Sequence, residues 1–191
     1  MRKCYSMDDD LEKAINVLLN GGVVIARTDT IYGILARADL KKAVEKVFEI
    51  KNRNLQKPNV ILLTKYEDLP NISEKNRQTY QKLNQERPTT IVLPASDNSP
   101  EFLTRGGKSL AFRVVENHPN LIRIIERTGK LIAPSANPEN KAPARNITEA
   151  RRYFGKKIDF YLDDGEVAEN LPSRIIQIDE NGTIKTLRGK T

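Results

Sequence analysis

The chain has 191 residues, of which 38% are apolar and 30% charged, and it carries a net charge of +7. A chain of this length and apolar content predicts one folded domain, residues 1–191, whose core needs no disulfide or metal. Cys4 is the only cysteine and His118 the only histidine, which excludes an internal disulfide and a Cys/His zinc site. The sequence contains neither a signal-peptide pattern nor an apolar run of membrane-spanning length, so we expect a cytoplasmic protein without a membrane partner.

The pattern of apolar residues predicts helices and strands that alternate along most of the chain. Leu11 to Leu19 has helical spacing, with Asp8 or Asp9 as the expected cap. In chain order we then expect a strand at 22–26, an apolar segment at 31–36, a helix from 39 and a strand at 59–64. A helix at 73–86 follows, then strands at 90–94 and 109–115 joined by a loop, and a helix from 119. The last expected elements are a strand at 130–133, a helix at 148–154, a strand at 158–162 and a hairpin at 174–188 turned by Asn181-Gly182. This order predicts an α/β fold, an open, twisted, mixed β-sheet with helices packed on it.

Two segments imitate a phosphate-binding loop but lack its required glycine. Gly107-Lys108-Ser109 and Gly189-Lys190-Thr191 end like a P-loop, yet Phe102 and Ile184 stand where the first glycine is needed. The serine, cysteine and zinc motifs of hydrolases are also missing. The lone His118 lies at a helix start, where a capping role is more common than catalysis. Any ATP must therefore be held outside a P-loop.

Four polar segments lie at the ends of expected strands or helices, which is where open α/β sheets bind ligands. They are residues 27–33, 51–53, 109–113 and 133–137. Lys51 and Arg53 end a helix, so they can equally be cations that complement the negative end of the helix dipole. Ser135 and Asn137 follow a buried strand and place hydrogen-bonding side chains on one side of an extended chain, although an ordinary turn explains them as well.

Arg113 differs from these residues because it lies inside an apolar strand, between Ala111-Phe112 and Val114-Val115. A guanidinium on a buried strand requires a carboxylate or phosphate partner. We therefore expect Arg113 to serve a ligand anion, and we expect its removal to change the folding stability little or to raise it.

Together and in this order, the four segments resemble the YrdC-like (TsaC-type) threonylcarbamoyl-AMP synthase family. That family carries P-T-E-T-x-Y-G, then K-x-R, then A-x-R followed by H-P, and then S-x-N. This chain has R-T-D-T-I-Y-G at 27–33, K-N-R at 51–53, A-F-R at 111–113 with His118-Pro119, and S-A-N at 135–137. The similarity extends from about Leu11 to Arg188. It implies a YrdC-like fold, a twisted mixed sheet with a concave basic cavity.

The resemblance also implies an activity and the residues that perform it. The activity is that of an L-threonylcarbamoyladenylate synthase, which forms threonylcarbamoyl-AMP and pyrophosphate from L-threonine, bicarbonate and ATP for threonylcarbamoyladenosine modification of tRNA. The implied ATP-facing residues are Lys51 and Arg53, which are also the catalytic cations, with Ser135, Asn137, Lys57, Thr90 and Arg188. The implied threonine pocket comprises Thr30, Arg113 and Ser173. Mg²⁺ is expected to arrive with ATP, and no protein-bound metal is predicted.

The same resemblance implies a partner protein. The chain ends soon after Arg188, without the additional C-terminal domain of longer family members. We therefore expect a separate transferase to place the threonylcarbamoyl group on tRNA.

The chain departs from the family pattern at several positions, which leaves other functions open. The departures are Arg27, Asp29, Asn54, Glu86, Arg87, Glu139, Asn140 and Arg174. One alternative is a YrdC-like paralogue that binds nucleotide or RNA with little synthase activity. Another is a nucleic-acid-binding module that uses Lys41, Lys42, Lys46, Arg145, Arg151, Arg152, Lys156 and Lys157 as a phosphate track. These cations fall on expected helix faces and a loop without interleaved aromatic residues, which favours a solvated surface.

Overall fold

The computed structural model describes residues 6–51, 59–168 and 171–189. Within these ranges, none of the helices combines the length and the apolar character that crossing a membrane requires. The helices are α1 (Met7–Leu19), α2 (Lys41–Lys51), α3 (Glu74–Glu86), α4 (Glu101–Thr104), α5 (Pro119–Thr128) and α6 (Ile147–Phe154), with short 3-10 helices η1 (Tyr66–Asp68) and η2 (Gly155–Lys157).

In the described part of the chain, the strands form a 9-stranded mixed sheet in the order β7-β1-β2-β6-β3-β5-β4-β8-β9. Their bounds are β1 (Val24–Arg27), β2 (Tyr32–Arg37), β3 (Val60–Leu63), β4 (Thr89–Pro94), β5 (Ser109–Val114), β6 (Leu131–Ile132), β7 (Phe160–Tyr161), β8 (Arg174–Ile178) and β9 (Ile184–Arg188). Three neighbouring pairs are parallel, β1 with β7, β3 with β5 and β4 with β8, and the other pairs are antiparallel. The predicted α/β fold with a mixed open sheet is confirmed.

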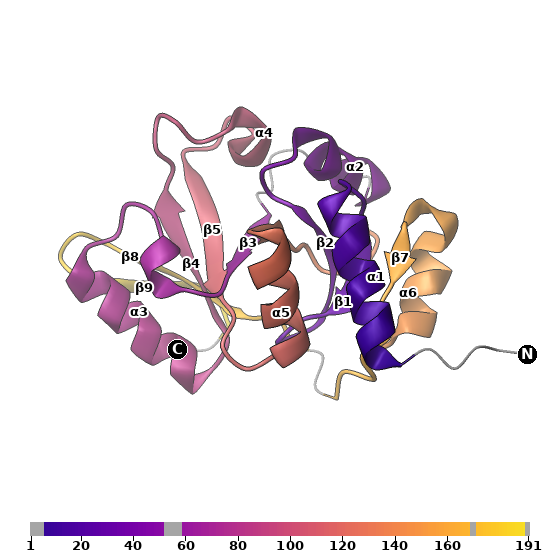
Figure 1. Ribbon diagram of the computed structural model, residues 1–191. Coiled ribbons are helices and arrows are strands. Elements are labelled where there is room, and N and C mark those ends of the chain that lie inside the picture. Colours follow the sequence, from indigo (N-terminus) through magenta and orange to yellow (C-terminus); the bar gives the residue numbers. More distant parts are fainter. Residues whose placement is uncertain (1–5, 52–58, 169–170, 190–191) are drawn as a thin grey trace, which may run out of the picture.

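Helices cover both faces of the sheet because its central strands are apolar on both sides. Along β2, Leu35 packs into one core cluster with α1 and α5, whereas Ile34 and Ala36 pack into a second cluster on the opposite face. Side chains of a strand alternate between its two faces, so such a strand needs cover on both. Figure 1 shows α1 and α5 side by side in front of the sheet, with α6 beside β7 at its edge.

Several details differ from the sequence-based expectations. The expected cap of α1 at Asp8 or Asp9 is wrong, because Ser6 is the N-cap and accepts a hydrogen bond from the backbone N–H of Asp9. The Asp9 side chain accepts in return from the Ser6 N–H, which completes a capping box. The loop expected between β4 and β5 contains the short helix α4. The apolar segment 31–36 contributes β2, a full strand of the sheet.

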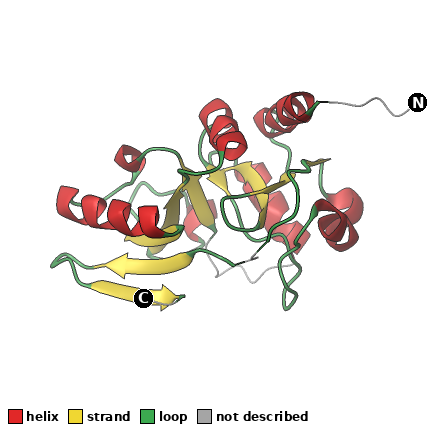
Figure 2. Cartoon of the chain, turned by 90° about the horizontal axis from the view of Figure 1, so that it is seen from below, coloured by secondary structure: helices red, strands yellow, loops and turns green. Residues whose placement is uncertain are grey.

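The expected hairpin at 174–188 is confirmed as β8 and β9. Gly182 has a φ of 89°, a left-handed conformation that glycine adopts without strain. The hairpin runs alongside α3 at one end of the molecule (Figure 2), where the Asn76 amide donates a hydrogen bond to the Asp179 carbonyl. This contact joins the hairpin to α3, and β9, which carries Arg188, pairs with β8.

The segment after β6 is held beside β2 by backbone hydrogen bonds. Ile34 donates its N–H to the Pro134 carbonyl at 2.8 Å, and Ala136 donates to the Tyr32 carbonyl at 2.8 Å. A further bridge pairs Gly33 with Ser135. Two polar segments about a hundred residues apart in the sequence therefore lie next to each other.

Candidate functional site

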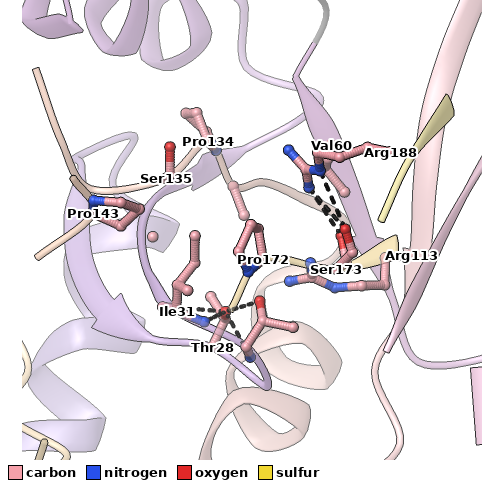
Figure 3. A pocket seen from close by; sticks show the side chains of 13 residues that line it. Thr28, Ile31, Val60, Arg113, Pro134, Ser135, Pro143, Pro172, Ser173 and Arg188 are labelled. Atoms are coloured by element: carbon pink, nitrogen blue, oxygen red, sulfur yellow. Dashed lines mark hydrogen bonds between the residues drawn. The ribbon is translucent and has the colours of Figure 1, made fainter. Parts of the chain in front are cut away.

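A cavity of about 200 Å³ lies where three of the four predicted polar segments meet, residues 27–33, 109–113 and 133–137. Its walls come from the turn after β1, from β3 and β5, from the segment after β6, and from the residues around β8 and β9. Five predicted site residues line it, namely Thr30, Arg113, Ser135, Ser173 and Arg188. Figure 3 shows the guanidinium groups of Arg113 and Arg188 on either side of Ser173. The apolar part of the lining includes Ile31, Val60 and Pro172.

Arg113 is buried, with 5% of its surface exposed, and it forms an ion pair with Asp29. The Nη2 atom of Arg113 lies 2.8 Å from Oδ1 of Asp29, and both side chains are more than nine-tenths buried. Asp29 supplies the carboxylate that a guanidinium in an apolar strand requires, so this partner belongs to the chain itself, and a role toward a ligand anion stays a prediction. The Nε atom of Arg113 has no hydrogen-bond partner among the described residues, so the ion pair leaves part of its donor capacity unused.

Ser173 joins two other predicted residues, Thr90 and Arg188, into one hydrogen-bonded group. The hydroxyls of Thr90 and Ser173 are 2.8 Å apart, and Arg188 donates to the Ser173 carbonyl at 3.0 Å. Thr90 has no exposed surface and lies behind Ser173, outside the lining of the cavity. Its direct contact with ATP therefore stays a prediction, while its contact with Ser173 is part of the structure.

Two arginines line the cavity, and one of them, Arg113, is paired with Asp29. Burial lowers the pKa of Arg188, and the positive charge of nearby Arg113 lowers it further. Two like charges that disfavour each other in a partly buried site are best compensated by an anion between them. A carboxylate or a phosphate is such an anion.

Lys51, in the last turn of α2, lies against the segment after β6 and is only 7% exposed. Its Nζ donates a hydrogen bond to the backbone carbonyl of Ser135. Lys51 and Ser135, two of the seven residues implied to face ATP, are therefore in contact. Arg53 and Lys57 lie outside the described residues. Helix capping does not account for the burial of Lys51, because a cation that only complements a helix dipole has no need to be buried.

Asn137, another of the residues implied to face ATP, shapes its own loop. Its amide donates to the carbonyls of Pro138 at 3.0 Å and Lys141 at 2.6 Å. Its Oδ1 is buried without a hydrogen-bond partner among the described residues. That oxygen is an unused acceptor.

Two departures from the family pattern have a visible structural role. Asn140 has a φ of 66°, and asparagine is the residue other than glycine that adopts this conformation most easily. Asparagine therefore suits the left-handed backbone conformation at this position. Arg174 is 5% exposed and donates to the Leu83 carbonyl at 2.8 Å and to the Thr89 hydroxyl at 3.2 Å, which joins β8 to α3 and β4.

His118 has both ring nitrogens engaged. Its Nδ1 accepts a hydrogen bond from the Leu121 N–H at 3.2 Å and caps α5, while its Nε2 lies 3.3 Å from Oδ2 of Asp164. A ring that accepts at Nδ1 and donates at Nε2 is the neutral tautomer with no nitrogen left for proton transfer. The predicted capping role is confirmed.

This environment makes a prediction about stability and pH. Burial lowers the pKa of His118, against the opposing effect of the Asp164 and Asp29 carboxylates. Because the unfolded chain then binds a proton more readily, the free energy of unfolding should fall as the pH drops below about 6.5, the ordinary pKa of histidine. In a His118→Asn variant, which keeps an N-cap, this contribution should be absent. The test measures the Tm of the wild type and of His118→Asn at about pH 7.5 and at about pH 5.5. The same fall in Tm for both proteins between the two pH values would contradict the prediction.

The cations considered as a phosphate track are partly engaged within the protein. Lys46 pairs with Asp159 at 2.6 Å, and Lys41 lies 3.8 Å from Glu45. The Arg151 guanidinium stacks over the Tyr161 ring, 4.4 Å from its centroid.

Among the described residues, no cluster of three or more His, Cys, Asp and Glu side chains is arranged to hold a metal ion.

Comparisons with known proteins agree with one another. The Sua5/yciO/yrdC family model, described as "Telomere recombination", matches residues 16–189. A threonylcarbamoyl-AMP synthase from Pseudoalteromonas translucida is 30% identical over 168 residues, which cover 85% of this chain and 89% of that relative. Another from Escherichia coli O9:H4 is 32% identical over 174 residues, covering 87% and 90%.

Solved structures give the same result for the fold. The crystal structure of P. abyssi Sua5 complexed with L-threonine has a TM-score of 0.83 and 27% identity over 97% of this chain. This chain spans 55% of that Sua5 chain. Escherichia coli YciO has a TM-score of 0.78 at 18% identity, covering 93% of this chain and 87% of its own, which shows the fold alone.

Proposed function

The chain belongs to the Sua5/yciO/yrdC family, and from this membership we propose that it is an L-threonylcarbamoyladenylate synthase. The enzyme transfers the adenylyl group of ATP to a carbamate made from L-threonine and bicarbonate, and it releases pyrophosphate. Its product serves threonylcarbamoyladenosine modification of tRNA. The observation that carries the proposal is the cavity in which Arg113 and Arg188 face the same small space.

The cavity suits the amino-acid substrate. Its volume of about 200 Å³ is smaller than the ~300–1,000 Å³ typical of pockets for larger ligands. The Nε of Arg113 has no hydrogen-bond partner among the described residues. This guanidinium binds the threonine carboxylate, because the two groups match in geometry and charge. Thr30 and Ser173 supply hydroxyl groups from two other walls. ATP then extends from the cavity toward Lys51 and Asn137.

The chemistry requires charge neutralisation more than a general base. The threonine amine adds to bicarbonate with loss of water, and a carbamate oxygen then attacks the α-phosphorus while the bond to pyrophosphate breaks. Negative charge develops on the phosphate oxygens in this step, and cations such as Lys51 and Arg53 stabilise it. Ser135 and Asn137 orient the phosphates through neutral hydrogen bonds. The engaged nitrogens of His118 are consistent with a reaction that needs no histidine base.

Mg²⁺ is proposed to arrive with ATP and to supply further neutralisation of the phosphates. The described residues lack a carboxylate cluster, which fits an ion held by phosphate oxygens and water.

Transfer of the threonylcarbamoyl group to tRNA is proposed to require a separate transferase. Contact of this protein with RNA or tRNA remains an alternative, and the pairing of Lys46 with Asp159 argues against a continuous phosphate track.

Pyrophosphate release tests the proposed function. With ATP and Mg²⁺, pyrophosphate should form only when L-threonine and bicarbonate are both present, because the carbamate is the nucleophile. Incubations that omit each component in turn, with L-serine and L-valine in place of threonine as controls, measure this dependence. Equal release without threonine would exclude the synthase, and nucleotide binding without any release would identify the chain as a paralogue that lacks the activity.

A further inference from the structure

Arg113 and Arg188 line the same cavity, but they differ in how their charges are compensated. Arg113 forms its ion pair with Asp29 at 2.8 Å. Arg188, the last residue of β9, has no carboxylate partner among the described residues, and its hydrogen bonds all go to Ser173. Within the described lining of the cavity, Arg188 therefore carries the charge that the protein leaves uncompensated.

Hydrogen bonds to Ser173 hold the Arg188 guanidinium in place. Its Nε and Nη2 donate to the Ser173 carbonyl at 3.3 Å and 3.0 Å, and Nη2 lies 3.4 Å from the Ser173 hydroxyl oxygen. No residue in the described part of the chain accepts a hydrogen bond from Nη1. Both N–H groups of Nη1 are therefore left for a ligand.

The anion that suits Arg188 is a small one. The cavity of about 200 Å³ also has to hold L-threonine, which leaves no room for a nucleotide in the same space. ATP is proposed to extend toward Lys51, which contacts Ser135, and Figure 3 shows Ser135 well apart from Arg188. L-Threonine is a zwitterion without net charge, and its carboxylate is proposed to bind Arg113. Bicarbonate is the remaining small substrate, and its negative charge matches the uncompensated charge of Arg188.

We infer that Arg188 binds bicarbonate and then holds the carboxylate group that bicarbonate becomes on the threonine nitrogen. The inference rests on the proposed function. The threonine ammonium first loses a proton to solvent, and the neutral amine attacks the bicarbonate carbon. An N–C bond forms and the C–OH bond breaks, and the departing hydroxide takes a proton from the nitrogen and leaves as water.

The product of this step has the same charge pattern as the cavity. The carbamate carries two anionic groups, the carboxylate of threonine and the new carboxylate on its nitrogen. Figure 3 shows two guanidinium groups, those of Arg113 and Arg188, on either side of Ser173. One cation is thus available for each anionic group.

The α-phosphate of ATP is the competing ligand for Arg188, since it too is an oxyanion and the family resemblance implies a contact with ATP. The two assignments differ in which substrate depends on Arg188. If bicarbonate is the ligand, loss of the guanidinium raises the KM for bicarbonate; if the α-phosphate is the ligand, it raises the KM for ATP. Kinetic constants for the separate substrates therefore distinguish them.

Initial rates of pyrophosphate release by the full chain, in CO2-depleted buffer with bicarbonate as the varied substrate, test the inference. Arg188→Gln removes the charge and keeps an N–H donor for the Ser173 carbonyl. Its KM for bicarbonate should rise at least about tenfold, the effect of losing a charge-assisted contact. Its KM for ATP and its Kd for L-threonine, measured by calorimetry, should stay within about threefold of the wild type, because only a longer-range attraction is lost.

Two further variants serve as controls. Lys185→Gln removes an exposed cation from the same strand and should leave all three constants unchanged, which accounts for the change in net charge. Arg188→Lys keeps the charge without the planar fork, so it should raise the KM for bicarbonate less than Arg188→Gln does. If Arg188→Gln does not fold, Arg188→Lys replaces it in the comparison.

Several results would overturn the inference. An unchanged KM for bicarbonate in folded Arg188→Gln is one, and a rise in the KM for ATP of the same size is another. Threonine binding lost to the extent expected of Arg113→Ala would place the threonine carboxylate on Arg188 instead. Turnover that saturating bicarbonate does not restore would also contradict a bicarbonate site. Absence of pyrophosphate release by the wild type would overturn the proposed function together with the inference.

Discussion

Lys51→Ala and Arg53→Ala are each expected to reduce adenylate formation at least about a hundredfold, because each removes a cation that stabilises developing phosphate charge. Helix capping at an exposed terminus is worth less than about 1 kcal/mol, so loss of a cap alone cannot produce this result. Initial rates of pyrophosphate release at saturating ATP measure the effect. Ser135→Ala and Asn137→Ala should lose less individually, since each removes neutral hydrogen bonds.

The structure allows matched controls for Lys51. Lys51→Met keeps the aliphatic part of the buried side chain and removes only the charge and its bond to Ser135, so it should be as inactive as Lys51→Ala while retaining the circular dichroism spectrum. Lys42→Ala removes an exposed cation from the same helix and should leave the rate unchanged. Near wild-type turnover of Lys51→Met and Arg53→Ala would mean that the roles implied by the family do not apply to this chain.

Arg113→Ala is expected to weaken L-threonine binding by at least about 2 kcal/mol, the typical loss when one partner of a charge-assisted pair is removed. The sequence predicted little change or a rise in folding stability, but the buried ion pair with Asp29 gives a different expectation. Removing Arg113 leaves a buried carboxylate without its partner, which typically destabilises a protein by about 3–5 kcal/mol. Calorimetry and denaturant unfolding measure the two effects separately.

The double variant Arg113→Ala with Asp29→Asn separates these two roles. It removes the uncompensated carboxylate, so we expect much of the stability to return while threonine binding stays lost. Asp29→Asn alone serves as the control because it keeps Arg113. Recovery of threonine binding in the double variant would show that Arg113 acts only within the ion pair.

The sequence alone was sufficient for the features that depend on local spacing. Helical periodicity predicted α1 and α5, the dipeptide Asn181-Gly182 predicted the β8–β9 hairpin, and His118 before Pro119 predicted a cap. Each of these signals lies within one element or turn, where a few neighbouring residues determine the backbone. The position of Arg113 in an apolar strand likewise required a charged partner without saying which one.

Tertiary structure decided which of these residues meet. Asp29 and Arg113 are far apart in the sequence, as are Lys51 and Ser135 or Thr90 and Ser173. They meet because the fold places the strands, turns and helix that carry them near one another. Hydrophobic patterning specifies that a strand is buried but not which strand lies beside it. The family resemblance implied ligand-binding roles for Thr90 and Arg113. It did not imply their buried contacts with Ser173 and Asp29, because those depend on which strands are neighbours.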